Sequence, residues 1–366
     1  MVSSLFPAMI LSFGFSEYQF GILVAVGYLV NLVFQPITGR YSERFEARNL
    51  LALGISLMAA SMFLFMAANG FVMMLVAMLV LRFGSSFYHP VGVSAVSKTY
   101  SGSKLDSSMG FQSAFGNLGV VLAYVLSPLV YIAIGWHGPF IIYAALEIIT
   151  VIVTLTGMRM PKKDPVAKKE EAPTPANKFR LGLPLFFVVS AFVTGGAYAI
   201  FGSFGNILLF RHGFGISLSD YTMAVWVVSA FLGAIMFGRI IKRISRLKLM
   251  GLAYFLAGIS TVVFGLSSHN LVIAVLGLLV NGFTVSTTYP VMYSELTAFL
   301  GERSKGVAFG VLFSSNIAGS SILGFVGGYV GSAFGLQVVF LISSVLLFCS
   351  LLPTFVWAKE RQKQNI

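Results

Sequence analysis

Long apolar segments dominate this sequence and restrict what it can fold into. A helix needs about 20 mostly apolar residues to cross the hydrocarbon core of a bilayer, and eleven segments meet that requirement. They lie at 17–38, 50–68, 71–97, 108–130, 138–158, 183–206, 217–238, 248–266, 270–295, 306–328 and 336–358. Only 10% of the residues are charged, whereas soluble domains carry about 25%. The chain therefore lacks the polar side chains to cover a water-facing surface, and we predict an all-α integral membrane protein.

A shorter apolar stretch, Val2–Phe13, precedes these segments. It is too short to cross a bilayer by itself. It also has no basic region before it, and the next span follows almost at once, so it does not resemble a cleavable signal peptide. We expect it to be the end of a further, truncated helix whose beginning lies upstream of Met1.

The lysines and arginines predict the orientation, because cytoplasmic loops collect them. When alternate loops are assigned to the cytoplasm, 22 of the 24 Lys and Arg residues fall there. The exceptions are Arg211, in a loop on the outer side, and Arg82, inside a span. This distribution predicts a multi-pass protein of the cell membrane with a cytoplasmic C-terminus. It also explains the net charge of +12 without a nucleic-acid partner.

The two halves of the sequence resemble each other at an offset of about 200 residues. Matching pairs include Pro90 and Pro290, Gly110 and Gly310, Gly119 and Gly319, and Gly135 and Gly335. Between the halves, the segment 159–182 is polar and rich in proline, as in a flexible linker. We predict a six-helix bundle at 1–158 with a truncated first helix, a cytoplasmic linker at 159–182 and a second six-helix bundle at 183–366. Repeats of this kind are typical of transporters that bind their substrate between the halves.

Short motifs give the sequence a resemblance to the major facilitator superfamily. The segment GRYSERFEAR at 39–48 resembles the signature loop between its second and third helices, and GRIIKRISR at 238–246 resembles the second copy. Arg82 lies where the family often has a fourth-helix arginine. YHPVG at 88–92 and GNLG at 116–119 resemble the fosmidomycin-resistance-type exporters. The resemblance implies a twelve-helix, two-bundle fold that works by alternating access.

The signature loops supply candidate cytoplasmic gating residues. Arginines and a carboxylate packed into a short turn can form charge-assisted pairs that hold helices together in one state and release them in another. The expected pairs are Glu43 with Arg44 or Arg48, and Glu295 with Arg239 or Arg243, and the glycines are expected in tight turns. The alternative for each arginine is that it has no gating role and only reflects the general enrichment of basic residues in cytoplasmic loops. The full set is Gly39, Arg40, Glu43, Arg44, Arg48, Gly238, Arg239, Arg243 and Glu295.

Polar residues inside the spans supply candidates for the substrate and proton pathway. Arg82, Ser85 or Ser86 and His89 lie on the predicted fourth helix and, at about 100° per residue, share one face. Arg82 can bind a substrate anion or pair with a carboxylate such as Glu147, and a carboxylate within a span is a functional hypothesis by default. Structural hydrogen bonds are the alternative role for each residue. The candidates are Arg82, Ser86, Tyr88, His89, Gln112, Asn117, Glu147, Tyr198, Asn281, Tyr289 and Asn316, and Trp226 is considered with them.

Signatures of enzymes are missing from the sequence. It has no phosphate-binding GxxxxGK[ST] loop and no HExxH pair, so we expect no ATP hydrolysis, no metal site and no cofactor. One cysteine, Cys349, excludes disulfides within the chain. We predict a monomeric secondary transporter of small molecules, coupled to protons or another ion, that exports a drug-like or anionic compound. The alternatives are a proton-linked importer of an organic acid or sugar and, remotely, a non-transporting receptor or scaffold.

Overall fold

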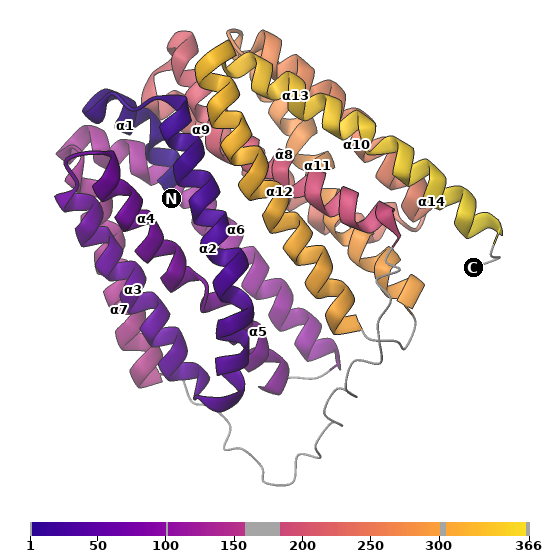
Figure 1. Cartoon of the computed structure of the whole chain (residues 1–366), viewed down its shortest axis with the longest axis horizontal. Coiled ribbons are helices and arrows are strands. Elements are labelled where there is room, and N and C mark those ends of the chain that lie inside the picture. The colour runs from indigo at the N-terminus through magenta and orange to yellow at the C-terminus, as the bar shows by residue number, and fades with distance from the viewer. Residues whose placement is uncertain (1, 100–101, 158–183, 301–304, 364–366) are drawn as a thin grey trace.

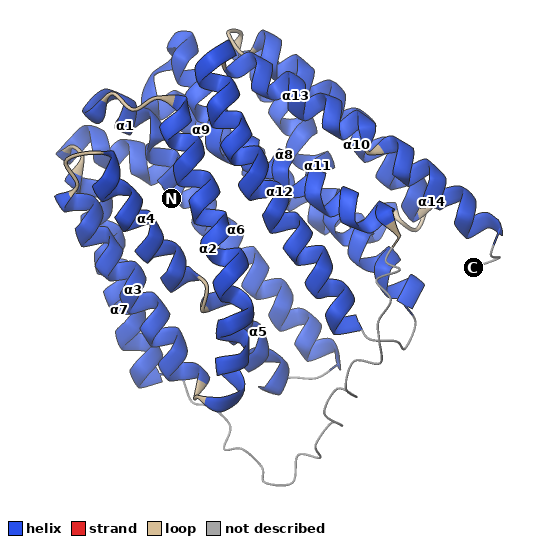
Figure 2. Ribbon diagram, viewed as in Figure 1, coloured by secondary structure: helices blue, strands red, loops and turns tan. Residues whose placement is uncertain are grey.

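The computed structural model describes residues 2–99, 102–157, 184–300 and 305–363, and every regular element in these ranges is helical (Figure 2). The elements are η1 (Val2–Leu5), α1 (Phe6–Phe13), α2 (Glu17–Arg44), α3 (Ala47–Ala67), α4 (Phe71–Ser85), α5 (Tyr88–Thr99), α6 (Gly102–Ile134), α7 (His137–Gly157), α8 (Leu185–Leu209), η2 (Phe210–Phe214), α9 (Gly215–Ile240), α10 (Arg246–Ser267), α11 (Leu271–Leu300), α12 (Lys305–Phe334), α13 (Leu336–Cys349) and α14 (Leu351–Lys363).

Ten helical stretches among the described residues are long and apolar enough to cross a membrane. One of them, Leu185–Phe237, is 53 residues long and comprises α8, η2 and most of α9. The chain turns within it at Gly213 and Gly215, where φ is 91° and 68°, values that glycine adopts without the clash of a Cβ atom. The prediction of an all-helical membrane protein is confirmed, and the count of twelve helices stays a prediction.

The helices form two groups, which lie side by side in Figure 1 and contact each other through α2 with α12 and α6 with α9. In the first group α3 packs against α4 and α7, and in the second α8 packs against α12, and α10 against α11 and α13. Gly135 and Gly335, one of the predicted repeat pairs, have φ of 74° and 91°. They occupy equivalent places, after α6 and after α12. The whole of the predicted linker, 159–182, lies outside the described residues, so the domain boundaries stay predictions.

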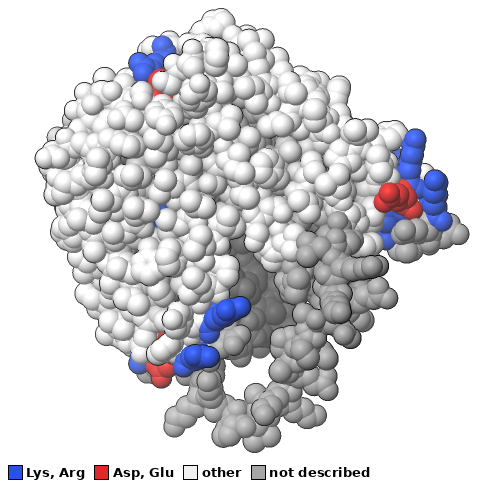
Figure 3. Space-filling view, viewed as in Figure 1, with Lys and Arg blue, Asp and Glu red and all other residues white. Residues whose placement is uncertain are grey.

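In the view of Figure 3, charged side chains gather at the upper left and, toward the other end of the molecule, at the lower left and the right, and the surface between them is almost entirely uncharged. We call one end the basic end, because α2, α9 and α14 finish there with basic residues in their last turns. The opposite end holds η2 and the start of α2. An uncharged belt between two charged rims is the surface that a bilayer requires.

The two groups pack most closely toward the opposite end. There α2 and α12 approach backbone to backbone, since a Cβ atom placed on Gly21 would lie 2.6 Å from the Cα atom of Gly328. Glycines allow this approach because they present no side chain. One ion pair also joins the groups, with Arg211 Nη2 2.8 Å from Glu17 Oε1. The contact between the groups is therefore tight at the opposite end.

The first predicted signature loop is largely helical, and the second begins as the last residues of a helix. α2 continues to Arg44 and α9 to Ile240, so the expectation of tight turns at Gly39 and Gly238 is wrong. A single glycine costs a helix only about 1 kcal/mol, and the residues after it are compatible with helix. Gly39 instead faces Pro90, because a Cβ atom added to it would lie 3.6 Å from the proline Cβ. The chain leaves α2 only at Phe45, whose backbone is extended.

Candidate functional site

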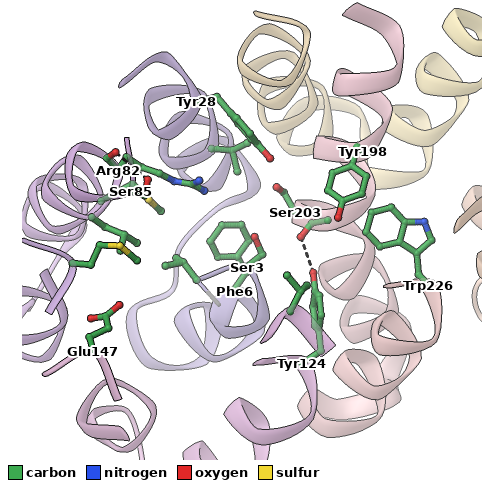
Figure 4. A pocket seen from close by; sticks show the side chains of 17 residues that line it. Ser3, Phe6, Tyr28, Arg82, Ser85, Tyr124, Glu147, Tyr198, Ser203 and Trp226 are labelled. Carbon is green, nitrogen blue, oxygen red and sulfur yellow. Dashed lines mark hydrogen bonds between the residues drawn. The ribbon is translucent and has the colours of Figure 1, made fainter. Parts of the chain in front are cut away.

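A cavity of about 310 Å³ lies between the two groups of helices (Figure 4). Both groups contribute to its lining, and η1 and α1 contribute as well. Its size is at the lower end of the range for small-molecule sites. Most of the lining is apolar or aromatic, with a few polar groups among them. The lining residues are Val2, Ser3, Phe6, Val24, Tyr28, Met58, Met78, Leu81, Arg82, Ser85, Val120, Tyr124, Glu147, Tyr198, Gly202, Ser203 and Trp226.

Arg82 is the cation of this cavity. Its side chain crosses from α4 to α2, where the guanidinium carbon lies 5.3 Å from the centre of the Tyr28 ring. Gly27 makes room for it, since a Cβ atom there would lie 3.0 Å from Arg82 Nε. Nε is buried and makes no hydrogen bond within the described residues, and none of the four ion pairs found there includes Arg82. The guanidinium is thus held by an aromatic ring and has hydrogen-bonding capacity left for a ligand.

Glu147 reaches the same cavity from α7. Figure 4 shows its carboxylate and the Arg82 guanidinium entering from different helices on one side of the cavity. The two residues form no ion pair in the structure as described, so the predicted pairing of Arg82 with Glu147 does not occur in this state. One carboxylate oxygen of Glu147 is buried and makes no hydrogen bond to the described residues. Since an unpaired carboxyl group at membrane depth is costly, this group is a candidate for binding a proton.

The prediction of one polar face from Arg82 to His89 is wrong, because the fourth span is not a continuous helix. α4 ends at Ser85, and α5 begins at Tyr88 after a turn. Pro90 explains the break, since it has no N–H to donate to the carbonyl of Ser86. That carbonyl accepts a hydrogen bond of 2.8 Å from the Thr38 hydroxyl of α2 instead.

Only part of the predicted pathway set meets at the cavity. Arg82, Glu147 and Tyr198 line it, as does Trp226, whose ring centre lies 4.8 Å from that of Tyr198. The other predicted residues whose side chains are described are absent from its lining, and four of them lie in the first group of helices. These are Ser86, which is buried, Tyr88 and His89, whose rings contact each other, and Asn117 on α6. The side chain of Gln112 lies outside the described residues.

The remaining three polar candidates make internal hydrogen bonds in the second group of helices. Asn281 is fully buried, accepts from Trp226 Nε1 at 3.0 Å and donates to the Thr261 hydroxyl at 3.0 Å. The Asn316 amide donates to the Tyr289 hydroxyl at 3.3 Å and also to a carbonyl of α8. These bonds favour the structural alternative for all three. Asn281 still acts on the cavity indirectly, because it orients the indole of Trp226.

The gating carboxylates have other partners than predicted. Glu295 is buried and accepts from Arg361 Nε at 2.8 Å and from Trp357 Nε1 at 3.1 Å, so its predicted pairing with Arg239 or Arg243 is wrong. Sequence spacing could not indicate a partner on α14, 66 residues away. Arg48 pairs with Glu46 at 3.4 Å. The side chain of the other predicted acid, Glu43, lies outside the described residues.

Comparison with known families identifies the protein's class. The model of the Major Facilitator Superfamily matches residues 1–236 and 214–366. The chain belongs to the major facilitator superfamily. It is therefore a membrane transporter and not an enzyme.

Two bacterial relatives of this superfamily cover most of the chain. Multidrug resistance protein 1 of Bacillus subtilis (strain 168) is 22% identical over 85% of this chain and 78% of its own length. The Fosmidomycin resistance protein of Escherichia coli (strain K12) is 22% identical over 97% of this chain and 88% of its own. A crystal structure of a mutant of the nucleoside transporter NupG superposes with a TM-score of 0.79 at 17% identity, covering 97% and 94% of the two chains. The structural likeness confirms the fold.

The structure contains a second buried acid, Asp220 of α9, which is not among the residues predicted from the sequence. It is fully buried and accepts a hydrogen bond of 2.9 Å from the Asn206 amide of α8. The same amide nitrogen donates to the carbonyl of Ser3 at 2.7 Å. The cluster thus ties η1 to the second group of helices. The signal was available, because Asp220 lies inside the predicted span 217–238 and the rule that selected Glu147 applies equally to it.

Proposed function

We propose that this transporter carries small anionic or amphiphilic compounds and exports them in exchange for protons. The observation that carries the proposal is Arg82, a cation in the cavity between the helix groups with no carboxylate partner among the described residues. A charge at membrane depth needs a counter-charge, and a substrate anion supplies it. Guanidinium donors suit carboxylate, phosphate or phosphonate groups.

The aromatic part of the lining supports an amphiphilic substrate. Tyr28, Tyr198 and Trp226 present ring surfaces to the cavity, which can bind the apolar part of a substrate. The Tyr124 hydroxyl of α6 donates to the carbonyl of Gly202 of α8 at 2.9 Å, so Tyr124 joins the two groups of helices at the cavity. The acidic head of a substrate would lie at Arg82 and its apolar part along the rings.

The conformation supports alternating access. The groups are joined by Arg211 and Glu17, by Gly21 and Gly328, and by the Ser321 hydroxyl, which donates to the carbonyl of Ala25 at 2.8 Å. Arg211 belongs to η2, and the other residues belong to the parts of α2 and α12 nearer the opposite end. We take the state to be closed at that end and open toward the basic end, which the lysine and arginine distribution assigns to the cytoplasm.

Two buried carboxyl groups are the candidates for proton coupling. Glu147 lies in the cavity wall, and Asp220 lies where η1 meets α8 and α9. Each has one buried oxygen without a hydrogen bond to the described residues. Proton transfer at Glu147 changes the charge next to the substrate, and at Asp220 it changes the charge at the contact between the groups. We propose export as the direction of transport because two relatives of this chain are named as resistance proteins.

Everted membrane vesicles with an imposed pH gradient test the proposal. An exchanger releases the gradient when its substrate is added, which a fluorescent pH probe reports. We expect release by members of a panel of organic carboxylates, phosphates and phosphonates, with fosmidomycin included. Arg82→Lys should weaken the response and Arg82→Gln abolish it, because lysine keeps the charge and loses the two-pronged donor. Release by uncharged or cationic compounds alone, or an unchanged response in Arg82→Gln, would overturn the assignment.

A further inference from the structure

A second cavity, of about 900 Å³, opens at the basic end of the second group of helices. It lies between α10 and α14, with the loop before α10 and the end of α11 closing it. Its lining holds four basic residues, Arg246, Lys248, Lys359 and Arg361, and a single acid, Glu295. We call it the basic groove. The basic groove therefore carries a strongly positive charge. Its lining residues are far in sequence from Arg82, and none of them lines the transport cavity.

Arg361 has an unused donor in this groove. Its side chain is only 10% exposed, and its Nε donates to Glu295 Oε1 at 2.8 Å. Its Nη1 is buried and makes no hydrogen bond to the described residues. The same Glu295 oxygen already accepts from Trp357 Nε1, and Arg246 Nη1 lies 4.0 Å from the other oxygen. One carboxylate thus serves two arginines, and a buried guanidinium N–H without an acceptor costs free energy. An anion in the groove would remove that cost.

The groove adjoins a surface that suits acyl chains. Leu351 and Phe355 of α14 line it. Phe355 is 67% exposed, and Leu352 beside them is 72% exposed. The ammonium group of Lys359 lies 5.7 Å from the centre of the Phe355 ring. The basic residues of the groove and an apolar helix face thus meet at one edge of the transmembrane region. An ordinary soluble anion would use only the basic part.

We propose that the basic groove binds the phosphate group of an anionic phospholipid of the cytoplasmic leaflet. Arg361 Nη1 donates to a phosphate oxygen, and the other three cations surround the headgroup. The acyl chains lie along Phe355. Basic pockets between helices at the cytoplasmic side are a recurrent way of binding such headgroups. A bound lipid would join the ends of α10, α11 and α14 into one unit. The proposal does not depend on which compound the protein transports.

Thermal unfolding of the purified protein in detergent tests this, because a ligand of the folded state raises the melting temperature. The probes are dioleoylphosphatidylglycerol, dioleoylphosphatidylcholine and inorganic phosphate, each titrated. The test variant is Lys248→Gln with Lys359→Gln, which leaves the buried pair of Arg361 and Glu295 intact. The matched control is Lys242→Gln with Lys363→Gln. It removes the same charge from the same end, at two exposed positions outside the groove lining.

We expect phosphatidylglycerol to stabilise the wild-type and control proteins at similar concentrations. The groove variant should need about thirtyfold more lipid, because each basic residue near the surface contributes about 1 kcal/mol. Equal stabilisation by phosphatidylcholine would overturn the proposal, as would an equal loss in the control variant. If inorganic phosphate stabilises the protein at the same concentration as the lipid, and only the groove variant loses this effect, the groove binds free phosphate and the proposal of a phospholipid is overturned.

Discussion

The contact between Gly21 and Gly328 should control which end of the transporter is open. A methyl group at Gly21 would lie 2.6 Å from the Gly328 Cα atom and 3.1 Å from the carbonyl oxygen of Gly324. These are backbone atoms, so a side-chain rotation cannot relieve the overlap. Overpacking of this kind costs about 1–3 kcal/mol. The cost applies only while α2 and α12 touch, so Gly21→Ala should shift the populations about 5- to 150-fold toward the state that is open at this end.

Distances between spin labels at the opposite end measure the shift. We would place the labels at Leu11 and Phe334, which are 60% and 69% exposed, after replacing the native cysteine by Cys349→Ser. Gly21→Ala should add or enlarge a population with a longer distance. Gly119→Ala is the matched control, since it makes the same helical replacement with nothing within 4 Å. Any gain in helix propensity is common to both. Identical distance distributions in the two variants, both well folded, would refute the reasoning.

Three other substitutions test separate contacts. Thr38→Val removes the hydroxyl that donates to the Ser86 carbonyl at the break between α4 and α5, and should lower the free energy of unfolding by about 1 kcal/mol. Thr150→Val should cost less, because the Thr150 hydroxyl bonds only to its own helix. Equal melting curves for the two variants would contradict this. Glu295→Gln leaves Arg361 without its carboxylate and should cost about 3–5 kcal/mol, so near-normal stability would show that the pair is dispensable. Arg211→Gln removes an ion pair whose arginine side chain is 47% exposed. It should change the ratio of the populations that the spin labels report by less than about fivefold, and high salt should remove the difference from the wild type.

The sequence was sufficient for the membrane class and for the positions of the helices. Both follow from the length of the apolar segments, which the bilayer thickness sets. The family resemblance also held, because its motifs extend over both halves. Helix ends were predicted less well. α2 runs to Arg44 rather than stopping at Gly39, because a polar helix is stable outside the bilayer and hydropathy does not detect it.

The site was predicted only in part, for reasons of geometry. Arg82 and Glu147, which line the candidate cavity, were selected because a charge at membrane depth is costly wherever its partner lies. Asn281 was also selected, but its amide is used within its own group of helices, and hydrogen-bond partners far apart in sequence leave no local pattern. Tyr28 was missed for the same reason, since its place beneath Arg82 depends on the packing of α2 against α4.

The accessibility of Ser85 from the two sides of the membrane tests the central claim, that the cavity at Arg82 is exposed alternately to each side. Ser85 lines this cavity, and Ser85→Cys with Cys349→Ser gives one reactive thiol there. A membrane-impermeant maleimide is applied to right-side-out and to everted vesicles. We predict labelling from both sides, slowed on both by a transported anion, with Gly21→Ala raising the rate from the opposite end. Labelling from one side only, unchanged by Gly21→Ala and by anions, would contradict the account.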